Sequence, residues 1–133
     1  MEILIKNSFK LSELQNQFNT AYPYLKIEFF ETPHTIKGSI PKSKLYPSER
    51  LLNSCRKIQT EGSISIDYNQ TVNKLEQIFW DKFGLSVQVF RKSGKLWIET
   101  SLTDSWTLVR QNQEGAEFSR FEPIKEIRRD NKE

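Results

Sequence analysis

The chain has 133 residues, of which 36% are hydrophobic and 28% charged, with five glycines, five prolines and a formal net charge of +3. These values predict one ordinary globular domain and exclude collagen, low-complexity disorder and, with a single cysteine, a disulfide scaffold. No stretch reaches the roughly 18 apolar residues of a membrane span, and the first residues lack the apolar block of a signal peptide. A cytoplasmic location is therefore expected.

The first element in chain order is a strand–helix–strand unit over residues 2–30. Alternating apolar residues give way to a helical stripe from Leu11 to Tyr22, which Pro23 ends, and alternation then resumes. Residues 63–91 repeat this order, with a helix from Val72 to Phe83. Thr71 is suited to cap the start of this second helix and Gly84 to end it.

An internal repeat is indicated by the alignment of these two halves. Placing Ile3 on Ile64 also aligns, at the same offset, Ile5 with Ile66, Leu11 with Val72, Leu14 with Leu75, Phe18 with Phe79 and Tyr22 with Phe83. The period changes from two to about 3.6 and back at the same places in both halves. We therefore expect two halves built on one plan.

The insertion between the halves, residues 31–62, is expected to be largely irregular because it contains Pro33, Gly38, Pro41 and Pro47. A short helix is predicted to begin at Pro47 and to carry Leu51, Leu52, Cys55 and Ile58 at helical spacing. Residues 33–57 also hold the excess positive charge, +5 from six basic residues and one acidic residue. Two interpretations remain open: a solvated lysine-rich connection, or a patch facing an anion or nucleic acid.

A hairpin is predicted over residues 85–91 and 95–102, with Ser93-Gly94 as a two-residue turn that places Phe90 opposite Trp97. After it, Thr103-Asp104 is expected to cap a short helix that carries Trp106 and stops at Gly115. Residues 1–122 then form one domain, whose hairpin and late helix occupy 85–115, and the charged residues 123–133 form a frayed tail.

These elements predict an α+β fold, a ferredoxin-like two-layer sandwich of two βαβ units with an added edge strand and short extra helices. The alternative places the strands of the two halves in separate or swapped sheets.

A resemblance adds to this reading. The run Thr71–Asn112 contains TVxxL, then FGLSVQVFRKSGKLWIET, then TDSWTLVRQN. It resembles a small bacterial domain family with no established activity, and it covers about a third of the chain. The resemblance implies a fold, but no catalytic or ligand-binding residue.

Motifs for chemistry are sparse. His34 and Cys55 stand without a second ligand at metal-binding spacing, and neither a glycine-rich phosphate loop nor a G-x-S-x-G elbow occurs. We therefore expect no catalytic residue, no metal and no cofactor, and a protein that is not an enzyme. An enzyme of unidentified class remains as an alternative.

An apolar surface on the side of the sheet away from the helices is the more informative feature. Strand alternation directs Leu4, Phe30, Phe90 and Trp97 to that side. The chain itself can cover them, with Trp106, Leu108 and Val109 or with the 48–58 segment. Otherwise they form a homodimer or other protein interface, or a platform for single-stranded nucleic acid. The basic residues suited to phosphates are Arg91, Lys92, Lys95, Lys42, Lys44 and Arg50.

From these patterns we expect a non-catalytic protein-interaction or self-association module that uses this aromatic surface. A single-stranded nucleic-acid-binding domain is the alternative. It lacks the aromatic signature of an RNA-recognition motif, because residues 62–67 read GSISID.

Overall fold

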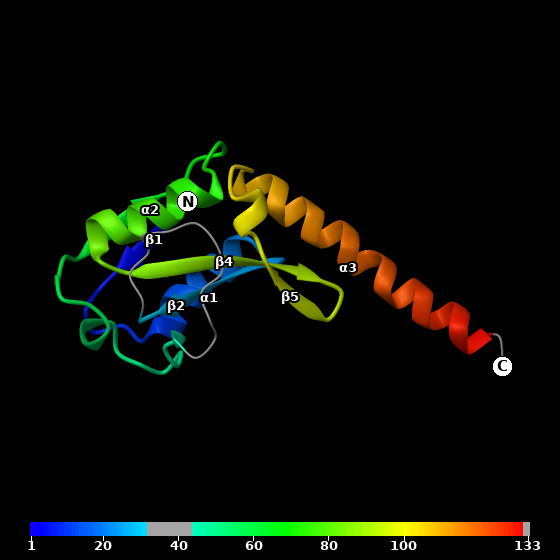
Figure 1. Cartoon of the computed structure of the whole chain (residues 1–133), viewed down its shortest axis with the longest axis horizontal. Helices are drawn as coiled ribbons and strands as arrows, with labels where there is room; N and C mark the ends of the chain where they lie inside the picture. The colour runs from blue at the N-terminus through cyan, green and yellow to red at the C-terminus, as the bar shows by residue number, and fades with distance from the viewer. Residues whose placement is uncertain (32–43, 132–133) are drawn as a thin grey trace.

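The computed structural model describes residues 1–31 and 44–131, with side chains to Arg120. Two strand–helix–strand units are followed by a hairpin strand and a long helix (Figure 1). The elements are β1 (Glu2–Ile5), α1 (Leu11–Ala21), β2 (Leu25–Phe30), η2 (Leu52–Ser54), β3 (Gly62–Ser65), α2 (Val72–Phe83), β4 (Ser86–Ser93), β5 (Leu96–Glu99), η3 (Ser101–Thr103) and α3 (Leu108–Asn131), where η2 and η3 are single 3₁₀ turns. The α+β class is confirmed.

The strands form two antiparallel sheets, one containing β1 and β3 and the other in the order β2-β4-β5. Ile3 lies opposite Ile64 in the first sheet, and Ile27 lies opposite Val89 in the second. The predicted ferredoxin-like topology needs one continuous sheet, so this pairing corresponds to the alternative with swapped sheets, in which each sheet takes a strand from each half. The apolar alternation of a strand specifies its buried face but not its neighbour, so it is compatible with both arrangements.

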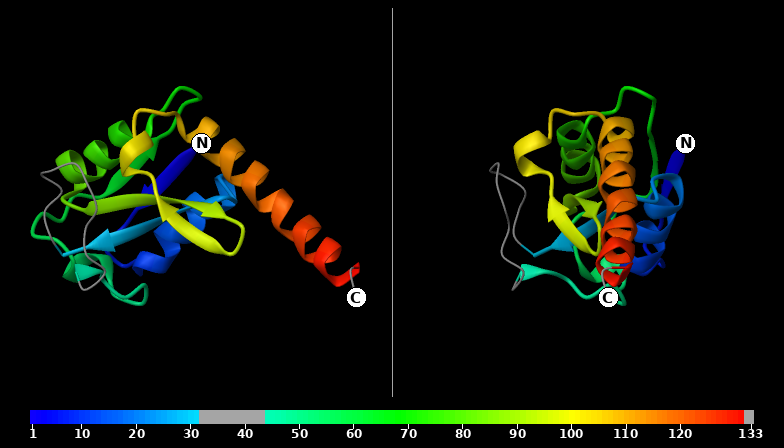
Figure 2. Two further views of the ribbon diagram at one scale, coloured as in Figure 1. Left: turned by 45° about the vertical axis from the view of Figure 1, so that its right-hand side comes forward. Right: turned by 90° about the vertical axis from the view of Figure 1, so that its right-hand side faces the viewer.

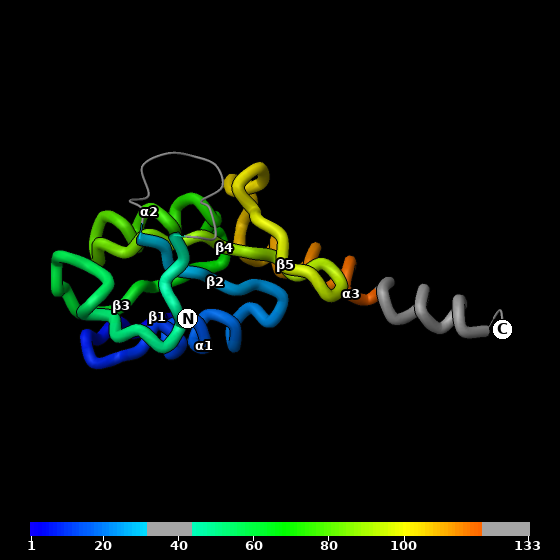
Figure 3. Tube along the Cα trace, turned by 60° about the horizontal axis from the view of Figure 1, so that its bottom comes forward, coloured from blue at the N-terminus to red at the C-terminus, as the bar shows by residue number. Residues whose placement is uncertain are grey.

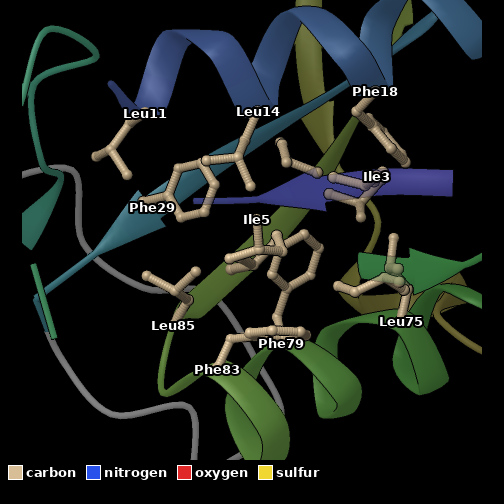
Figure 4. Close-up of a cluster of buried hydrophobic side chains, with 14 of the residues drawn as sticks. Ile3, Ile5, Leu11, Leu14, Phe18, Phe29, Leu75, Phe79, Phe83 and Leu85 are labelled. Atoms are coloured by element: carbon tan, nitrogen blue, oxygen red, sulfur yellow. The ribbon is translucent and has the colours of Figure 1, made fainter. Parts of the chain in front are cut away.

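One hydrophobic core joins both units. α1 and α2 lie on opposite sides of the central strands (Figure 3) and direct their apolar stripes toward each other (Figure 4). The rings of Phe29 and Phe79 meet edge to face with centroids 6.1 Å apart. Leu14, Leu75, Ile27 and Val87 all belong to this cluster. Complete burial of each such side chain stabilises the fold by roughly 1.5–3 kcal/mol.

The two predicted helices of the units are present nearly as expected. α1 ends one residue before Tyr22, and α2 has the predicted bounds. The Thr71 hydroxyl accepts a hydrogen bond from the Lys74 N–H at 3.3 Å, and Gly84 has a left-handed φ of 64°. Both capping predictions are confirmed.

The helix predicted from Pro47 is wrong, since only η2 forms there. The backbone of this segment instead bonds to neighbouring chain: Leu52 N–H donates to Phe9 C=O at 2.8 Å and Arg50 C=O accepts from Leu11 N–H at 2.9 Å. A helix would have to withdraw these groups from their partners. Leu52 is fully buried at the start of η2, so the apolar spacing identified a buried residue but not the structure of the segment.

The late helix is longer than predicted, because α3 begins after Trp106 and continues through Gly115 to Asn131. Its first part packs against the sheet of β2 and β4 (Figure 2). Gly115 allows a close approach: a Cβ there would lie 2.8 Å from the Cβ of Tyr24. The glycine therefore serves helix–sheet packing rather than termination. Part of the segment predicted as a frayed tail is helical as far as Asn131.

Candidate interaction surface

The β4–β5 hairpin turns at Gly94 and Lys95, between the opposed residues Ser93 and Leu96. Gly94 has a φ of 63°, which glycine adopts without steric cost, and it takes the first position of the two-residue turn. The predicted turn at Ser93-Gly94 put this glycine second and is wrong by one residue.

The register of the hairpin changes accordingly. Phe90 lies opposite Glu99 rather than Trp97, and Trp97 lies opposite Lys92. Because the partner shifts by two residues, each side chain stays on its expected face of the sheet. The prediction of which residues share a face therefore survives the error in pairing.

β5 is an edge strand, and in the part of the chain that the structure describes its one neighbour is β4. The pair that flanks a two-residue turn is hydrogen-bonded, and successive pairs alternate. By this alternation the backbone N–H and C=O groups of Trp97 and Glu99 point away from β4. Trp97 thus lies on the outer edge of β5, and strand edges of this kind accept another strand.

Two side chains end the β4–β5 ladder. Beyond Arg91, the next backbone groups of β4 that face β5 belong to Val89. The Val89 N–H donates to Glu76 Oε2 at 3.0 Å, and the Val89 C=O accepts from Thr100 Oγ1 at 2.8 Å. Glu76 and Thr100 thus occupy the places that a longer β5 would take. The ladder stops at Glu99 for this reason.

Exposed apolar side chains surround this edge. Leu96 is 69% exposed on β5, and Leu102 is 99% exposed just beyond its end. Phe118 on α3 is also exposed, and its ring lies 5.9 Å from the guanidinium of Arg91 on β4. Large apolar side chains exposed next to an open strand edge are typical of interaction surfaces.

The aromatic side of the hairpin is covered by a lysine. Lys26 Nζ lies 5.5 Å from the centroid of Phe90 and 5.2 Å from that of Trp97, and it pairs with Glu28 at 2.9 Å. Lys92 Nζ lies 5.8 Å from the Trp97 ring. Both rings are half-buried, so the late helix is not needed to cover them.

Phe30 and Leu4 do not join this surface. Phe30 is 3% exposed and faces a cavity at the other end of β2. Leu4 is exposed, but it lies on β1 in the other sheet, where its backbone N–H donates to Gln17. Only Phe90 and Trp97 of the four predicted surface residues lie together.

Arg91 lies on the opposite face of β4 from Phe90. It donates to Gln111 Oε1 at 2.9 Å, and its guanidinium lies 5.7 Å from the Trp106 ring. Arg91 therefore fixes α3 against the sheet instead of flanking the aromatic pair.

The other predicted basic contacts are dispersed. Lys92 and Lys95 are on the hairpin, whereas Arg50 stacks on Tyr46 at 5.1 Å in the insertion. Lys44 is exposed at the start of the second described segment, and Lys42 lies outside the described residues. The structure assembles no continuous basic patch from the described members of this set.

Glu76 was missed by sequence reasoning although its position carried a signal. Val72, Phe79 and Phe83 form one helical stripe, and Glu76 occupies the remaining place in it. Glu76 is 6% exposed, and burial raises its pKa to about 7. The hydrogen bond from Val89 N–H lowers this pKa, and the negative charge of Asp104 raises it further. A carboxylate at an apolar stripe position marks such a group.

No group of three His, Cys, Asp or Glu side chains among the described residues is arranged to hold a metal ion. His34 is outside those residues, and Cys55 is buried with a pKa that burial raises. No helix in the described part of the chain is both long and apolar enough to cross a bilayer.

Comparison with known proteins yields no relative. No protein-family model, no curated protein and no solved structure matches this chain. The resemblance of Thr71–Asn112 to a bacterial domain family stays a prediction.

Proposed function

We propose that this protein is an interaction module that self-associates through the free edge of β5. The observation that carries the proposal is a four-residue edge strand that carries the exposed side chain of Leu96 and is followed by that of Leu102. Pairing with a second strand at Trp97 would remove apolar surface from water.

The order of side chains along β5 favours a second copy of the same chain. An antiparallel two-fold pairing centred on Trp97 brings the turn residue Lys95, which directly precedes β5, near the partner's Glu99, and Glu99 near the partner's Lys95. On the other face it puts Leu96 opposite the partner's Ile98. The cross-strand pairs within β5, Trp97 with Trp97 and Leu96 with Ile98, are then apolar on both sides, which is a stabilising arrangement in antiparallel sheets.

The hydrogen-bonding pattern agrees with this register. Trp97 and Glu99 carry the outward N–H and C=O groups, and a two-fold centred on Trp97 makes the two Trp97 residues a hydrogen-bonded pair. The two three-stranded sheets would join into one continuous sheet. A homodimer interface with the same patch on both subunits is the commonest form of protein assembly.

We also propose that the two strand–helix–strand units derive from one repeated unit. Supporting this, β1 pairs with β3 and β2 with β4, so each strand lies beside its counterpart in the other half. The proposed dimer would repeat, between chains, the antiparallel pairing of like with like that occurs within the chain.

A charge swap tests the register. Lys95→Glu places like charges opposite each other at two symmetry-related positions, and we expect the dimer dissociation constant to rise about tenfold. Lys95→Glu combined with Glu99→Lys restores opposite pairs and should restore the wild-type constant. The measurement is sedimentation equilibrium over a concentration series.

Leu4→Ser is the matched control, because Leu4 is an exposed apolar residue on the other sheet. This variant should keep the wild-type association. A wild-type protein that stays monomeric at every concentration would contradict self-association, and a double variant as weak as the single one would contradict the register.

A further inference from the structure

A groove of about 460 Å³, called here the α1–β2 groove, lies where α1 packs beside β2 (Figure 3). Its lining comes from α1, the middle of β2, the segment from Leu45 to Ser48, and Trp97 of β5. The volume is within the range of roughly 300–1,000 Å³ of small-molecule sites. Asn16 and Asn19 of the lining are exposed, and Gln15 and Trp97 are half-buried, so a ligand in the groove can reach these side chains.

Two carboxamides of α1 are held in place by β2. Gln15 Nε2 donates to the Ile27 C=O at 3.0 Å and to Glu28 Oε1 at 3.1 Å. Asn19 Nδ2 donates to the Leu25 C=O at 2.8 Å. Because a carboxamide carries its oxygen on the arm opposite to its nitrogen, these bonds turn Gln15 Oε1 and Asn19 Oδ1 away from their strand acceptors.

Both of these oxygens are available as acceptors. No described residue donates a hydrogen bond to Gln15 Oε1 or to Asn19 Oδ1. They lie one helical turn apart on α1, and the carboxamide of Asn16 lies beside them at the same groove. The groove therefore offers oriented acceptors to a ligand that donates several hydrogen bonds.

The charges of the lining cancel within the protein. Lys26 and Glu28 are its charged residues among those that the structure describes, and they form an ion pair at 2.9 Å. Their side chains are 31% and 19% exposed, so both can still contact a ligand. A charged ligand would meet an opposite charge that already has a partner, so the groove favours a neutral ligand.

An aromatic ring lies beside these polar groups. Trp97 lines the groove, and Lys26 Nζ lies 5.2 Å from the centroid of its ring. An indole ring offers an apolar surface to the C–H groups of a ligand. A neutral ligand with hydroxyl donors on its rim and C–H groups on its face is a sugar.

We propose that the α1–β2 groove binds a neutral pyranose sugar. Its hydroxyls donate to Gln15 Oε1 and Asn19 Oδ1, its oxygens accept from Asn16 and Lys26, and its C–H face packs against Trp97. This binding does not rest on self-association. Because the Trp97 side chain also lies at the proposed β5 pairing, binding is measured at a protein concentration below dimer formation.

The test titrates the methyl pyranosides of glucose, galactose and mannose into the protein labelled with nitrogen-15 and follows chemical shifts by NMR. We expect saturable binding of at least one of them, with a dissociation constant on the order of 1 mM. The shifts should affect the side-chain amides of Gln15, Asn16 and Asn19 and the indole N–H of Trp97. Absence of saturable binding of all three sugars, or shifts confined to other regions, would overturn the proposal.

Two control ligands define the class. Sorbitol has the hydroxyls but no ring face, and it should bind at least about tenfold more weakly than the best pyranoside. Methyl glucuronide carries a carboxylate and should bind severalfold more weakly than methyl glucoside, because the positive charge of Lys26 is already paired. Equal binding of sorbitol, or tighter binding of the glucuronide, would contradict a neutral pyranose site.

Two variants locate the binding. Gln15→Lys keeps a donor to the Ile27 C=O but removes the acceptor oxygen, and it should weaken binding about fivefold. Asn16→Ala should weaken it about threefold and leave the melting temperature unchanged, since no described residue bonds to this side chain. Thr20→Ala is the matched control on α1, because Thr20 does not line the groove. Unchanged binding in both Gln15→Lys and Asn16→Ala would contradict the site.

The same variants separate this site from the β5 edge. Lys95→Glu should weaken self-association but bind the sugar like wild type, whereas Gln15→Lys should associate like wild type. Loss of sugar binding in Lys95→Glu would contradict the α1–β2 groove as an independent site.

Discussion

The β5 edge and the cavity that Phe30 faces, at the C-terminal end of α2, place polar groups in opposite environments. At the edge, the charges of Lys95 and Glu99 are exposed to water. At the cavity, Arg56 and Ser86 are buried, and each has an atom without a partner. Each exposed charge contributes little to the free energy of association, and its main effect is to disfavour wrong registers. A buried polar group has a large effect on the free energy of folding, and it stabilises the protein only when it has a partner. The first region is therefore suited to select a strand, whereas the second acts on the stability of the fold.

The largest expected effect concerns Glu76, the buried group at the end of the β5 ladder. Its pKa is about 7 in the folded protein against 4.5 as the ordinary value, so the folded state binds the proton more tightly. The stability that this proton provides is complete below about pH 4.5 and is lost as the pH rises to about 7. The loss is on the order of 3 kcal/mol at most.

Glu76→Gln isolates this titration, because its amide oxygen can still accept from Val89 N–H but carries no charge. We expect the variant to be more stable than wild type at pH 8 and equal to it near pH 4, in urea unfolding followed by circular dichroism. Asp104 is the acidic group that adds to the shift, so Asp104→Asn should reduce the pH dependence slightly. Parallel pH profiles of wild type and Glu76→Gln would show that burial does not control this carboxyl.

The next effect compares two positive charges directly. Arg56→Met removes the hydrogen bonds to Phe83 C=O and Asn7 Oδ1, and we expect it to lower the free energy of unfolding by about 2 kcal/mol. Lys95→Ala, at the exposed edge, should change it by less than about 0.5 kcal/mol. Chemical denaturation of both variants at a concentration below dimer formation measures the difference. If both variants lost the same free energy of unfolding, buried Arg56 and exposed Lys95 would not differ in their contribution to stability.

The third prediction tests how closely α3 packs on β2. Gly115→Ala adds a Cβ that would lie 2.8 Å from Tyr24 Cβ and 3.1 Å from Tyr24 O. Because backbone must move to relieve this contact, we expect a loss of about 1–2 kcal/mol in thermal unfolding. The loss should leave ligand binding at the α1–β2 groove unchanged, since α3 does not line it. A variant as stable as wild type would mean that α3 packs less closely on β2.

Much of the fold could be predicted from hydrophobic periodicity. The apolar stripes of α1 and α2 and the alternation in β4 identified buried positions such as Leu14, Phe79 and Val89. Periodicity specifies which face of a strand is buried but not which strand lies next to it. The division into two sheets could therefore not be predicted from it. The segment after Pro47 shows the same limit, because helical spacing there coexists with backbone bonds to Phe9 and Leu11.

The candidate sites were less predictable because they depend on tertiary register. Lys26 lies opposite Phe90 in the β2–β4 pairing, and only that register brings its ammonium over the Phe90 and Trp97 rings. The α1–β2 groove takes residues from four separate segments, and neither Gln15 nor Asn19 belongs to a motif. A carboxamide that is oriented by a strand cannot be distinguished from any other surface carboxamide by spacing alone.

The end of the β4–β5 ladder at Val89 bears on whether the proposed dimer could add further chains. Glu76 and Thr100 bond to the backbone groups of Val89 that face β5. At the opposite edge of this sheet, the C=O of Phe29 accepts from the Tyr46 N–H at 2.8 Å. In the proposed dimer the two outer strands of the joined sheet would be the β2 strands, where the C=O groups of Leu25, Ile27 and Phe29 already accept hydrogen bonds within the chain. Association by this route would therefore close on itself instead of continuing into a fibre.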